Sequence, residues 1–242
     1  MPVEYPYKVF ACGDHAVTID FGNVINTAVN QTVLHLFGRV KQQNITWVKD
    51  VIPAYSSITV VYDMIAVRVV SATSTAFDYV CAVLGKILAD DTGKTLITGK
   101  LVKIPACYEQ PFAPDLAQVA QQKGIPLHEV IRLHTAITYR VYMLGFLPGF
   151  AYMGTVDSKI NTPRKTTPRL NIPAGSIGIA GMQTGIYPVQ SPGGWNIIAA
   201  TPLILFDAAK TPPALLQPGD EVQFYPVTVA EFNHFKNTPW AC

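Results

Sequence analysis

Apolar and polar residues follow two different patterns along this chain of 242 residues. In the first ninety residues, apolar side chains recur at helical spacing from Ile25 to Val40 and again from Phe77 to Leu88, each set on one face of a helix. Runs rich in β-branched residues predict strands at 9–12, 16–21, 45–52 and 57–62. The first part of the chain is therefore predicted to be an α+β unit.

The second predicted helix sets the boundary of this unit. Ser74 or Thr75 is placed to cap its N-terminus, and the sequence Asp-Asp-Thr-Gly at 90–93 ends it. We therefore divide the chain into two domains, residues 1–94 and 95–242.

The second domain begins with a predicted strand at 101–106 and two short helical segments. Asp115 stands at the start of the first segment, as an N-cap or as an early acid that suits the helix dipole, and the second segment covers 126–134. Beyond Thr138, short apolar runs alternate with Gly, Pro and Asn turns. This pattern is typical of a β-barrel or sandwich and shows no further helix. The predicted strands lie at 141–144, 177–180, 186–189, 196–200, 203–206 and 222–225.

Composition adds the expectation of an apolar protein without a membrane span. Hydrophobic residues make up 49% and charged residues 14% of the chain, whereas globular proteins average about 25% charged residues. The most apolar stretch, 58–70, is broken by Asp63 and Arg68, and the first residues lack the pattern of a signal peptide. We expect a soluble, cytoplasmic protein. The surplus of apolar residues fits either a buried interface with a partner chain or a large core.

Charge and cysteine content argue against a nucleic-acid surface and against a metal site. The net charge is +2, and no cluster of Lys and Arg indicates a nucleic-acid surface. The four cysteines are far apart and form no Cys-x-x-Cys motif, which predicts free, mostly buried thiols and no metal site.

The segment from 139 to 202 is dense in Gly and Pro, residues that fix a backbone rather than fill a core. Among its aromatic residues, Phe146, Phe150, Tyr152 and Trp195 could belong to the core. The Gly and Pro around them favour the wall of a small-molecule pocket, to which Gln183 would contribute a polar group. The predicted substrate-binding residues of this segment are Phe146, Pro148, Phe150, Tyr152, Gln183, Ser191 and Trp195.

Two Thr-Pro-Arg sequences place Arg164, Lys165 and Arg169 on one stiffened loop. Pro reduces the entropy lost when such a loop binds a ligand, and Arg can hold a carboxylate or phosphate with two hydrogen bonds. A solvated basic loop is an equally good interpretation. His134 and Tyr139 precede the barrel strands and are candidates for hydrogen bonding or proton transfer, although a lone His is more often structural.

The motifs of this segment together resemble one family. They are Gly145–Tyr152 (GFLPGFAY), 167–169 (TPR), 172–181 (IPAGSIGIAG), 183–188 (QTGIYP) and 191–195 (SPGGW). The chain resembles the proteins that include the B-type subunit of bacterial ATP-dependent 5-oxoprolinase, the sporulation-kinase inhibitor Kip and allophanate hydrolase subunit 1. The resemblance covers nearly the whole chain. It implies an α+β fold, with a ferredoxin-like domain followed by a cyclophilin-like β-barrel.

The resemblance also implies a function shared with other chains. The family is similar to half of the carboxyltransferase domain of urea carboxylase, in which a companion half completes the active site. The chain would act with the C-type and A-type subunits of 5-oxoprolinase to phosphorylate and open the cyclic amide 5-oxo-L-proline. ATP and Mg²⁺ would be the cofactors. In one alternative, they bind mainly to the partner subunit. Arg169, His134 and Tyr139 would be catalytic, while Arg164 and Lys165 would bind substrate.

Two other functions remain open at this stage. The chain could bind a sensor histidine kinase as the Kip inhibitor does, or it could belong to a urea- or allophanate-type amidolyase. One segment departs from the family pattern, because residues 107–116 (CYEQPFAPDL) lack the Gly pair expected there. This departure leaves the substrate open.

Overall fold

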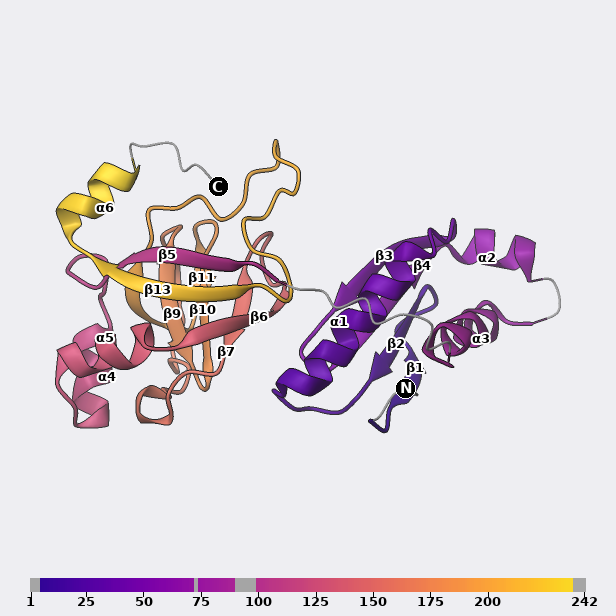
Figure 1. Cartoon of the computed structure of the whole chain (residues 1–242), viewed down its shortest axis with the longest axis horizontal. Coiled ribbons are helices and arrows are strands. Elements are labelled where there is room, and N and C mark those ends of the chain that lie inside the picture. The colour runs from indigo at the N-terminus through magenta and orange to yellow at the C-terminus, as the bar shows by residue number, and fades with distance from the viewer. Residues whose placement is uncertain (1–4, 72–73, 90–98, 237–242) are drawn as a thin grey trace. The chain divides into compact units, whose positions relative to one another are not determined.

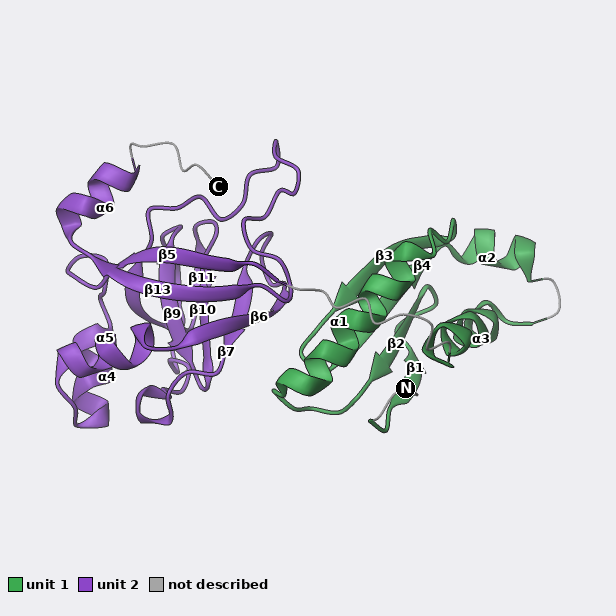
Figure 2. Ribbon diagram, in the orientation of Figure 1, with its two compact units in different colours: residues 1–98 green, residues 99–242 purple. Residues whose placement is uncertain are grey.

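The structure is a computed structural model that describes residues 5–71, 74–89 and 99–236. The chain divides into two compact units, residues 1–98 and 99–242 (Figures 1 and 2). The domain boundary predicted between residues 94 and 95 lies outside the described residues.

The first unit is an antiparallel four-stranded sheet with helices packed against it. The strand order is β1-β2-β4-β3, and the strands are β1 (Lys8–Ala11), β2 (Ala16–Asp20), β3 (Val48–Pro53) and β4 (Ser57–Tyr62). Helices α1 (Thr27–Gln42) and α3 (Ala76–Ala89) contact each other and the sheet. Their apolar faces meet buried sheet residues in one core, as the helical spacing predicted.

Local capping explains where the helices of this unit begin. The Thr75 hydroxyl accepts a hydrogen bond from the Asp78 N–H at 3.1 Å and donates one to the Asp78 carboxylate. Thr75 is therefore the N-terminal cap of α3. Helix α2 (Met64–Val70) was not predicted, because Asp63 and Arg68 had been interpreted as interruptions of an apolar run. Asp63 in fact begins this helix, since its carboxylate accepts the Ala66 N–H at 3.0 Å.

The second unit is built on a closed β-barrel. Its strand order is β10-β7-β6-β13-β5-β12-β9, and within it β5 and β13 run parallel. The strands are β5 (Leu101–Cys107), β6 (Thr138–Leu144), β7 (Ala151–Gly154), β9 (Ser176–Ala180), β10 (Gln183–Ile186), β12 (Asn196–Ala200) and β13 (Glu221–Val227). This confirms the predicted fold class, an α+β protein with a barrel in its second part.

Shorter elements surround the barrel. Strands β8 (Arg169–Ile172) and β11 (Ser191–Gly193) form a separate two-stranded sheet. The helical elements are α4 (Leu116–Lys123), α5 (Leu127–Thr135), the 3₁₀ helix η1 (Ser158–Ile160) and α6 (Val229–Lys236). Among the helices of the described ranges, none has the length and apolar content needed to cross a membrane.

Some predictions for the second unit were wrong. The run 203–206 is not a strand, because it pairs only through an isolated bridge between Phe206 and Ala214. The strand predicted at 186–189 is instead β10, which ends at Ile186. Helix α6 was not predicted, since Phe232 is its only fully buried residue and its sequence carries little helical periodicity. Strands β7, β8 and β11 were not predicted, because their three or four residues are too few to give a pattern.

The cysteines of the described ranges are free thiols, as predicted. Cys107 is buried, Cys81 is half-buried and Cys12 is exposed, so the expectation of mostly buried thiols was wrong for Cys12. Burial raises the pKa of the Cys107 and Cys81 thiols. Cys242 lies outside the described residues.

Candidate active site

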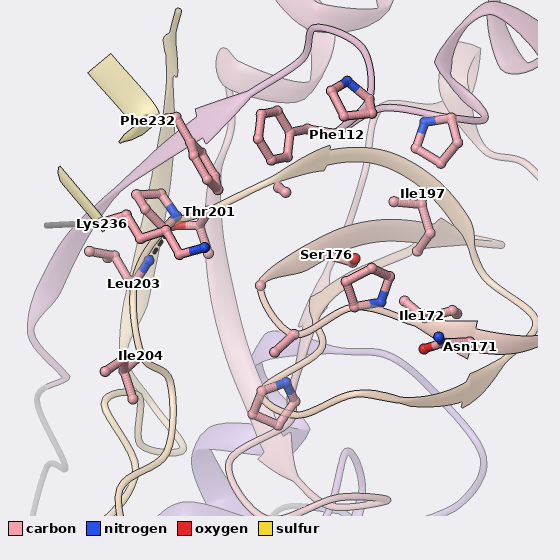
Figure 3. Close-up of a pocket in the computed structure, with 18 of the residues that line it drawn as sticks. Phe112, Asn171, Ile172, Ser176, Ile197, Thr201, Leu203, Ile204, Phe232 and Lys236 are labelled. Atoms are coloured by element: carbon pink, nitrogen blue, oxygen red, sulfur yellow. Dashed lines mark hydrogen bonds between the residues drawn. The ribbon is translucent and has the colours of Figure 1, made fainter. Parts of the chain in front are cut away.

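A pocket of about 570 Å³ opens in the second unit beside strand β8 (Figure 3). Its walls are mainly apolar, and the rings of Phe112 and Phe232 lie 4.1 Å apart where they line it. Two cations, Arg169 and Lys236, also line the pocket, and none of its lining residues is acidic. An apolar pocket of this size with a few polar groups is the usual form of a small-molecule site. We call it the β8 pocket.

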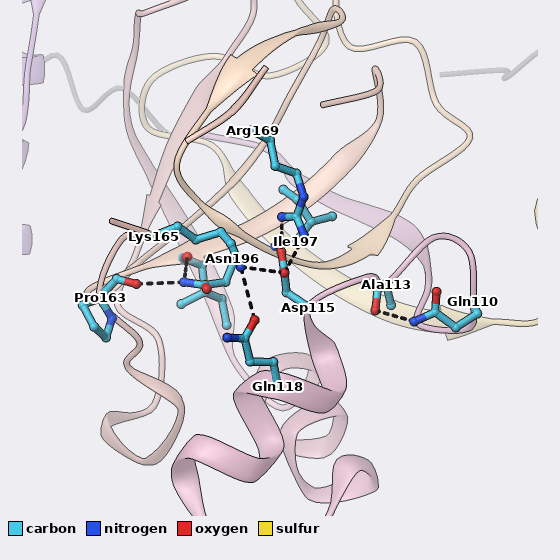
Figure 4. A network of polar contacts seen from close by, with 10 residues as sticks. Gln110, Ala113, Asp115, Gln118, Pro163, Lys165, Arg169, Asn196 and Ile197 are labelled. Atoms are coloured by element: carbon cyan, nitrogen blue, oxygen red, sulfur yellow. Dashed lines mark hydrogen bonds and ion pairs between the residues drawn. The ribbon is translucent and has the colours of Figure 1, made fainter. Parts of the chain in front are cut away.

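Asp115 is the centre of an ion-pair network at the edge of the β8 pocket (Figure 4). Arg169 donates to both carboxylate oxygens of Asp115, at 2.5 and 2.6 Å, and Lys165 Nζ lies 2.9 Å from Oδ1. The Ile197 N–H donates to Oδ2 at 2.7 Å, while the Asp115 N–H donates to the Ile197 carbonyl. The start of α4 is thus fixed to β12, and two cations are fixed to one carboxylate.

The Asp115 carboxylate is buried and charged. Its side chain is 2% exposed. Burial by itself would raise the pKa of this carboxyl, but hydrogen bonds from Arg169, Lys165 and the Ile197 N–H together lower it below its usual value. Asp115 occupies the N-cap position of α4 as predicted, yet its side chain makes no capping bond. The carboxylate instead accepts hydrogen bonds from Lys165 and Arg169.

A second, smaller pocket of about 310 Å³ lies on the Lys165 side of this network. Apart from Pro163, its lining residues are of polar or charged types, and they include Arg164, Thr166 and Thr167 of the loop, together with Asn196 of β12. Asn196 and Ile197 are neighbours on one strand and line different pockets. Asp115 pairs with Lys165 of this pocket and with Arg169 of the β8 pocket, so the two pockets adjoin. We call the smaller one the loop pocket.

The four predicted aromatic residues come together, but they do not line the β8 pocket. Phe150 has ring contacts with Phe146, Tyr152 and Trp195 at centroid distances of 5.7, 4.8 and 5.4 Å. Phe150 and Trp195 are buried, whereas Phe146 is exposed and has a positive φ of 68°. Core packing therefore accounts for Phe150 and Trp195, and their part in substrate binding stays a prediction.

Two adjacent glycines test how tightly this aromatic cluster is packed. A Cβ at Gly193 would lie 2.3 Å from the Tyr187 hydroxyl and 2.8 Å from Ile172, whereas a Cβ at Gly194 would have no neighbour closer than 3.6 Å. We expect Gly193→Ala to destabilise the second unit by about 1–3 kcal/mol and Gly194→Ala to have little effect. Thermal unfolding of both variants measures the difference, and equal midpoints would contradict the packing described here.

His134 and Tyr139 lie in the barrel interior and line neither the β8 pocket nor the smaller pocket beside it. Both side chains are fully buried. The Tyr139 hydroxyl donates to the His134 carbonyl at 2.9 Å, and the His134 ring stacks on Phe224 at 4.7 Å. Burial raises the pKa of Tyr139 above its usual value. The structure thus places these two predicted catalytic residues next to each other but apart from Arg169 at the β8 pocket, and their catalytic role stays a prediction.

The hydrogen bonds of His134 define its tautomer. The Thr184 hydroxyl donates to the Gly178 carbonyl at 3.1 Å, so it accepts from His134 Nε2–H at 3.0 Å. His134 Nδ1 is then the acceptor for the Tyr108 O–H at 2.7 Å. Burial lowers the pKa of His134 to about 3, which agrees with a neutral ring. A neutral histidine held in this way orients the Tyr108 and Thr184 hydroxyls.

The remaining predicted site residues lie in different places. Pro148 is exposed, and Gln183 is half-buried at the start of β10. The Ser191 hydroxyl is buried and has no hydrogen-bond partner among the described residues. Arg164 lies over the Trp195 ring, with its guanidinium carbon 5.8 Å from the ring centroid. Of the predicted substrate-binding residues, Arg164 and Lys165 line the loop pocket.

Comparison with known proteins decides the family. A family model described as carboxyltransferase domain, subdomain C and D, matches residues 7–216. The chain belongs to this family. It is also 40% identical over 232 residues to the B-type subunit of 5-oxoprolinase from Bacillus subtilis, a match that covers 95% of this chain and 97% of that protein. The resemblance predicted from the sequence motifs is thus confirmed.

Solved structures of other proteins have the same fold. TTHA0988 matches with a TM-score of 0.74 at 31% identity over 88% of this chain. This chain spans 40% of the TTHA0988 chain. The urea carboxylase of Kluyveromyces lactis matches over 97% of this chain with a TM-score of 0.73 at 17% identity, which shows the fold alone. The chain spans 23% of that protein.

Within this carboxyltransferase fold, some pocket residues were not predicted. Phe112 comes from the segment 107–116 that departs from the family pattern, and Pro111 and Pro114 of the same segment also line the β8 pocket. This segment therefore forms part of the wall of the β8 pocket. Phe232 comes from the unpredicted helix α6, so no sequence signal pointed to it.

Proposed function

We propose that this chain is the B-type subunit of an ATP-dependent 5-oxoprolinase and acts with the A-type and C-type subunits of that enzyme. The observation that carries the proposal is the 40% identity to the B-type subunit from Bacillus subtilis across 95% of this chain. The β8 pocket supports it, because several of its residues belong to the motifs that the family resemblance rests on, including Arg169 and Ser176.

The lining of the β8 pocket suits a small cyclic amide acid. 5-Oxo-L-proline carries a carboxylate and a lactam on an apolar five-membered ring. Arg169 and Lys236 are suited to the carboxylate, and the apolar walls are suited to the ring. In this proposal the C-type subunit contributes the rest of the complete site. A cytoplasmic location belongs to the same proposal.

The proposed reaction begins with phosphorylation of the lactam oxygen by ATP. A lactam carbonyl is stabilised by resonance, and the phosphorylated form has a good leaving group for ring opening to L-glutamate. Phosphoryl transfer depends on cations that stabilise the charge of the transition state. In this proposal ATP and Mg²⁺ bind to the assembled complex, and the cations of this chain neutralise part of the charge.

Reconstitution tests the proposal. With the cognate A-type and C-type subunits, we expect 5-oxo-L-proline-dependent ATP hydrolysis and glutamate release only when this chain is present. Ala174 lines the β8 pocket and is exposed. We expect Ala174→Trp to fill the pocket and reduce this activity roughly tenfold or more, in line with the loss of a well-packed ligand contact.

Ala117, which is exposed on α4 and lines none of the described pockets, provides the control. Ala117→Trp should leave the activity unchanged. Full activity of Ala174→Trp would exclude the β8 pocket as the substrate site. An assembled complex without 5-oxo-L-proline-dependent activity would contradict the oxoprolinase proposal and favour the kinase-inhibitor or amidolyase alternatives.

A further inference from the structure

The loop pocket holds a cation with no carboxylate to neutralise it. Among the residues that the structure describes, Arg164 forms no ion pair with an acid, and the lining of the loop pocket contains no Asp or Glu. Two threonine side chains, Thr166 and Thr167, line the same pocket. We infer that the loop pocket binds a phosphoryl group, with Arg164 as its main ligand.

The loop that carries these residues is fixed at several points before any ligand arrives. Thr162 is buried and bridges to Gly181, and the Lys165 N–H donates to the Gly194 carbonyl at 2.8 Å. At the far end of the loop, Arg169 belongs to β8 and pairs across to β11. Pro163 and Pro168 restrict the backbone between these points. A loop organised in this way loses little entropy when it binds an anion.

Both cations of the loop pocket are held in place by neighbours. The Arg164 guanidinium lies over Trp195, whose indole face attracts a cation. Lys165 Nζ has three N–H groups, and it uses two of them for Asp115 and for Gln118 Oε1 at 3.2 Å. One N–H of Lys165 and the N–H groups of Arg164 are therefore available to an oxygen-rich ligand.

The charge of the network matches a phosphoryl group better than a single carboxylate. Asp115 balances the charge of Arg169, which donates to both of its oxygens and lines the β8 pocket, so Arg164 and Lys165 leave two positive charges at the loop pocket. The remaining positive charge is close in size to that of a phosphate ester, about −1.5 to −2 near pH 7. Thr hydroxyls can donate to its remaining oxygens.

This inference deepens the proposed function and rests on it for the use of the site. Lys165 of the loop pocket and Arg169 of the β8 pocket both donate to Asp115 Oδ1. A phosphoryl group in the loop pocket would therefore lie next to a ring bound in the β8 pocket. The ligand class is a phosphoanhydride or phosphate ester, either from a nucleoside triphosphate or from a phosphorylated substrate.

Calorimetric titration of pyrophosphate into the full chain alone tests the inference. We expect Arg164→Gln to weaken pyrophosphate binding at least tenfold, because a charged hydrogen-bonding ligand is lost. Arg164→Lys should have an intermediate effect, since it keeps the charge but loses the planar fork. Lys103→Gln is the control, because this substitution makes the same change in net charge. Lys103 is exposed on β5 and lines none of the described pockets. This variant should bind like the unmodified chain.

The outcomes separate the site from general electrostatics. Equal weakening by Arg164→Gln and Lys103→Gln, or no pyrophosphate binding by the unmodified chain, would overturn the inference.

Comparing the binding of tripolyphosphate and ATP then identifies the source of the phosphoryl group. Tighter binding of ATP indicates a nucleotide, and equal binding indicates a phosphorylated substrate, with the phosphoryl site supported in both cases. Because this assay needs no turnover, its failure with an active reconstituted complex would leave the proposed function standing. Pyrophosphate binding by the chain, together with an inactive reconstituted complex, would support the phosphoryl site and contradict the proposed function.

Discussion

Asp115→Ala is expected to lower the free energy of unfolding of the second unit by about 3–5 kcal/mol, as removal of one partner from a buried ion pair does. The substitution removes the acceptor of Arg169, Lys165 and the Ile197 N–H together. Two cations would then be left close to each other without their counter-charge. Urea denaturation, followed by hydrogen exchange of peptides from β9 and β12, measures the change in this unit.

A second ion pair in the same unit supplies the control for Asp115. Glu129 pairs with Arg132 one helical turn away, and the Arg132 side chain is 61% exposed. Glu129→Ala should therefore cost less than about 1 kcal/mol. Asp115→Asn should fall between the two, because the amide oxygen can still accept one hydrogen bond while the charge is lost. A cost for Asp115→Ala no larger than that for Glu129→Ala would show that the network does not stabilise the barrel.

Local patterns in the sequence were sufficient to predict the four strands and the two longer helices of the first unit, but not α2, and the class of the second unit. Helix α1 has an apolar face at helical spacing and a capping residue, Asn26, whose side chain accepts two N–H groups of the first turn. The strands of the barrel were predicted where an apolar run had turn residues on both sides. Elements that lack such a run, such as β8 and α6, were missed.

The candidate site depended on contacts that no local pattern contains. Asp115 meets Lys165, Arg169 and Ile197 across 50, 54 and 82 residues of sequence. From its neighbours alone, Asp115 resembles a helix cap. The basic loop was predicted because its three cations and its prolines are close in sequence. Which of these cations is neutralised could be determined only from the fold.

His134 shows how much of a residue's surroundings depends on the fold. A histidine next to a motif region suggested proton transfer, but this ring is held between Tyr108 and Thr184 and stacks on Phe224 inside the barrel. The sequence carried one sign that His134 is buried, which is its place on the same helix as the apolar residues Val130 and Leu133, both of which are buried. A histidine on the inner face of an amphipathic helix is expected to be buried with them.

The buried His134 is also expected to make the second unit less stable in mild acid. Burial lowers its pKa to about 3, whereas a histidine in an unfolded chain titrates near pH 6.5. Between these two pH values the unfolded state binds one proton more than the folded state, so stability falls as the pH falls. From pH 6 to pH 4.5, this residue alone should reduce the free energy of unfolding by about 2 kcal/mol.

Comparing variants at these two pH values isolates the contribution of His134. His134→Phe keeps an aromatic ring against Phe224 but cannot take up a proton, so the loss between pH 6 and pH 4.5 should shrink by about 2 kcal/mol. At pH 6 the variant should be less stable than the unmodified chain, because the Tyr108 O–H loses its acceptor. His128→Gln changes an exposed histidine of the same helix and should keep the original pH dependence. If His134→Phe kept it as well, the protonation of some other group would account for the acid sensitivity. The neutral, structural role of His134 would then be contradicted.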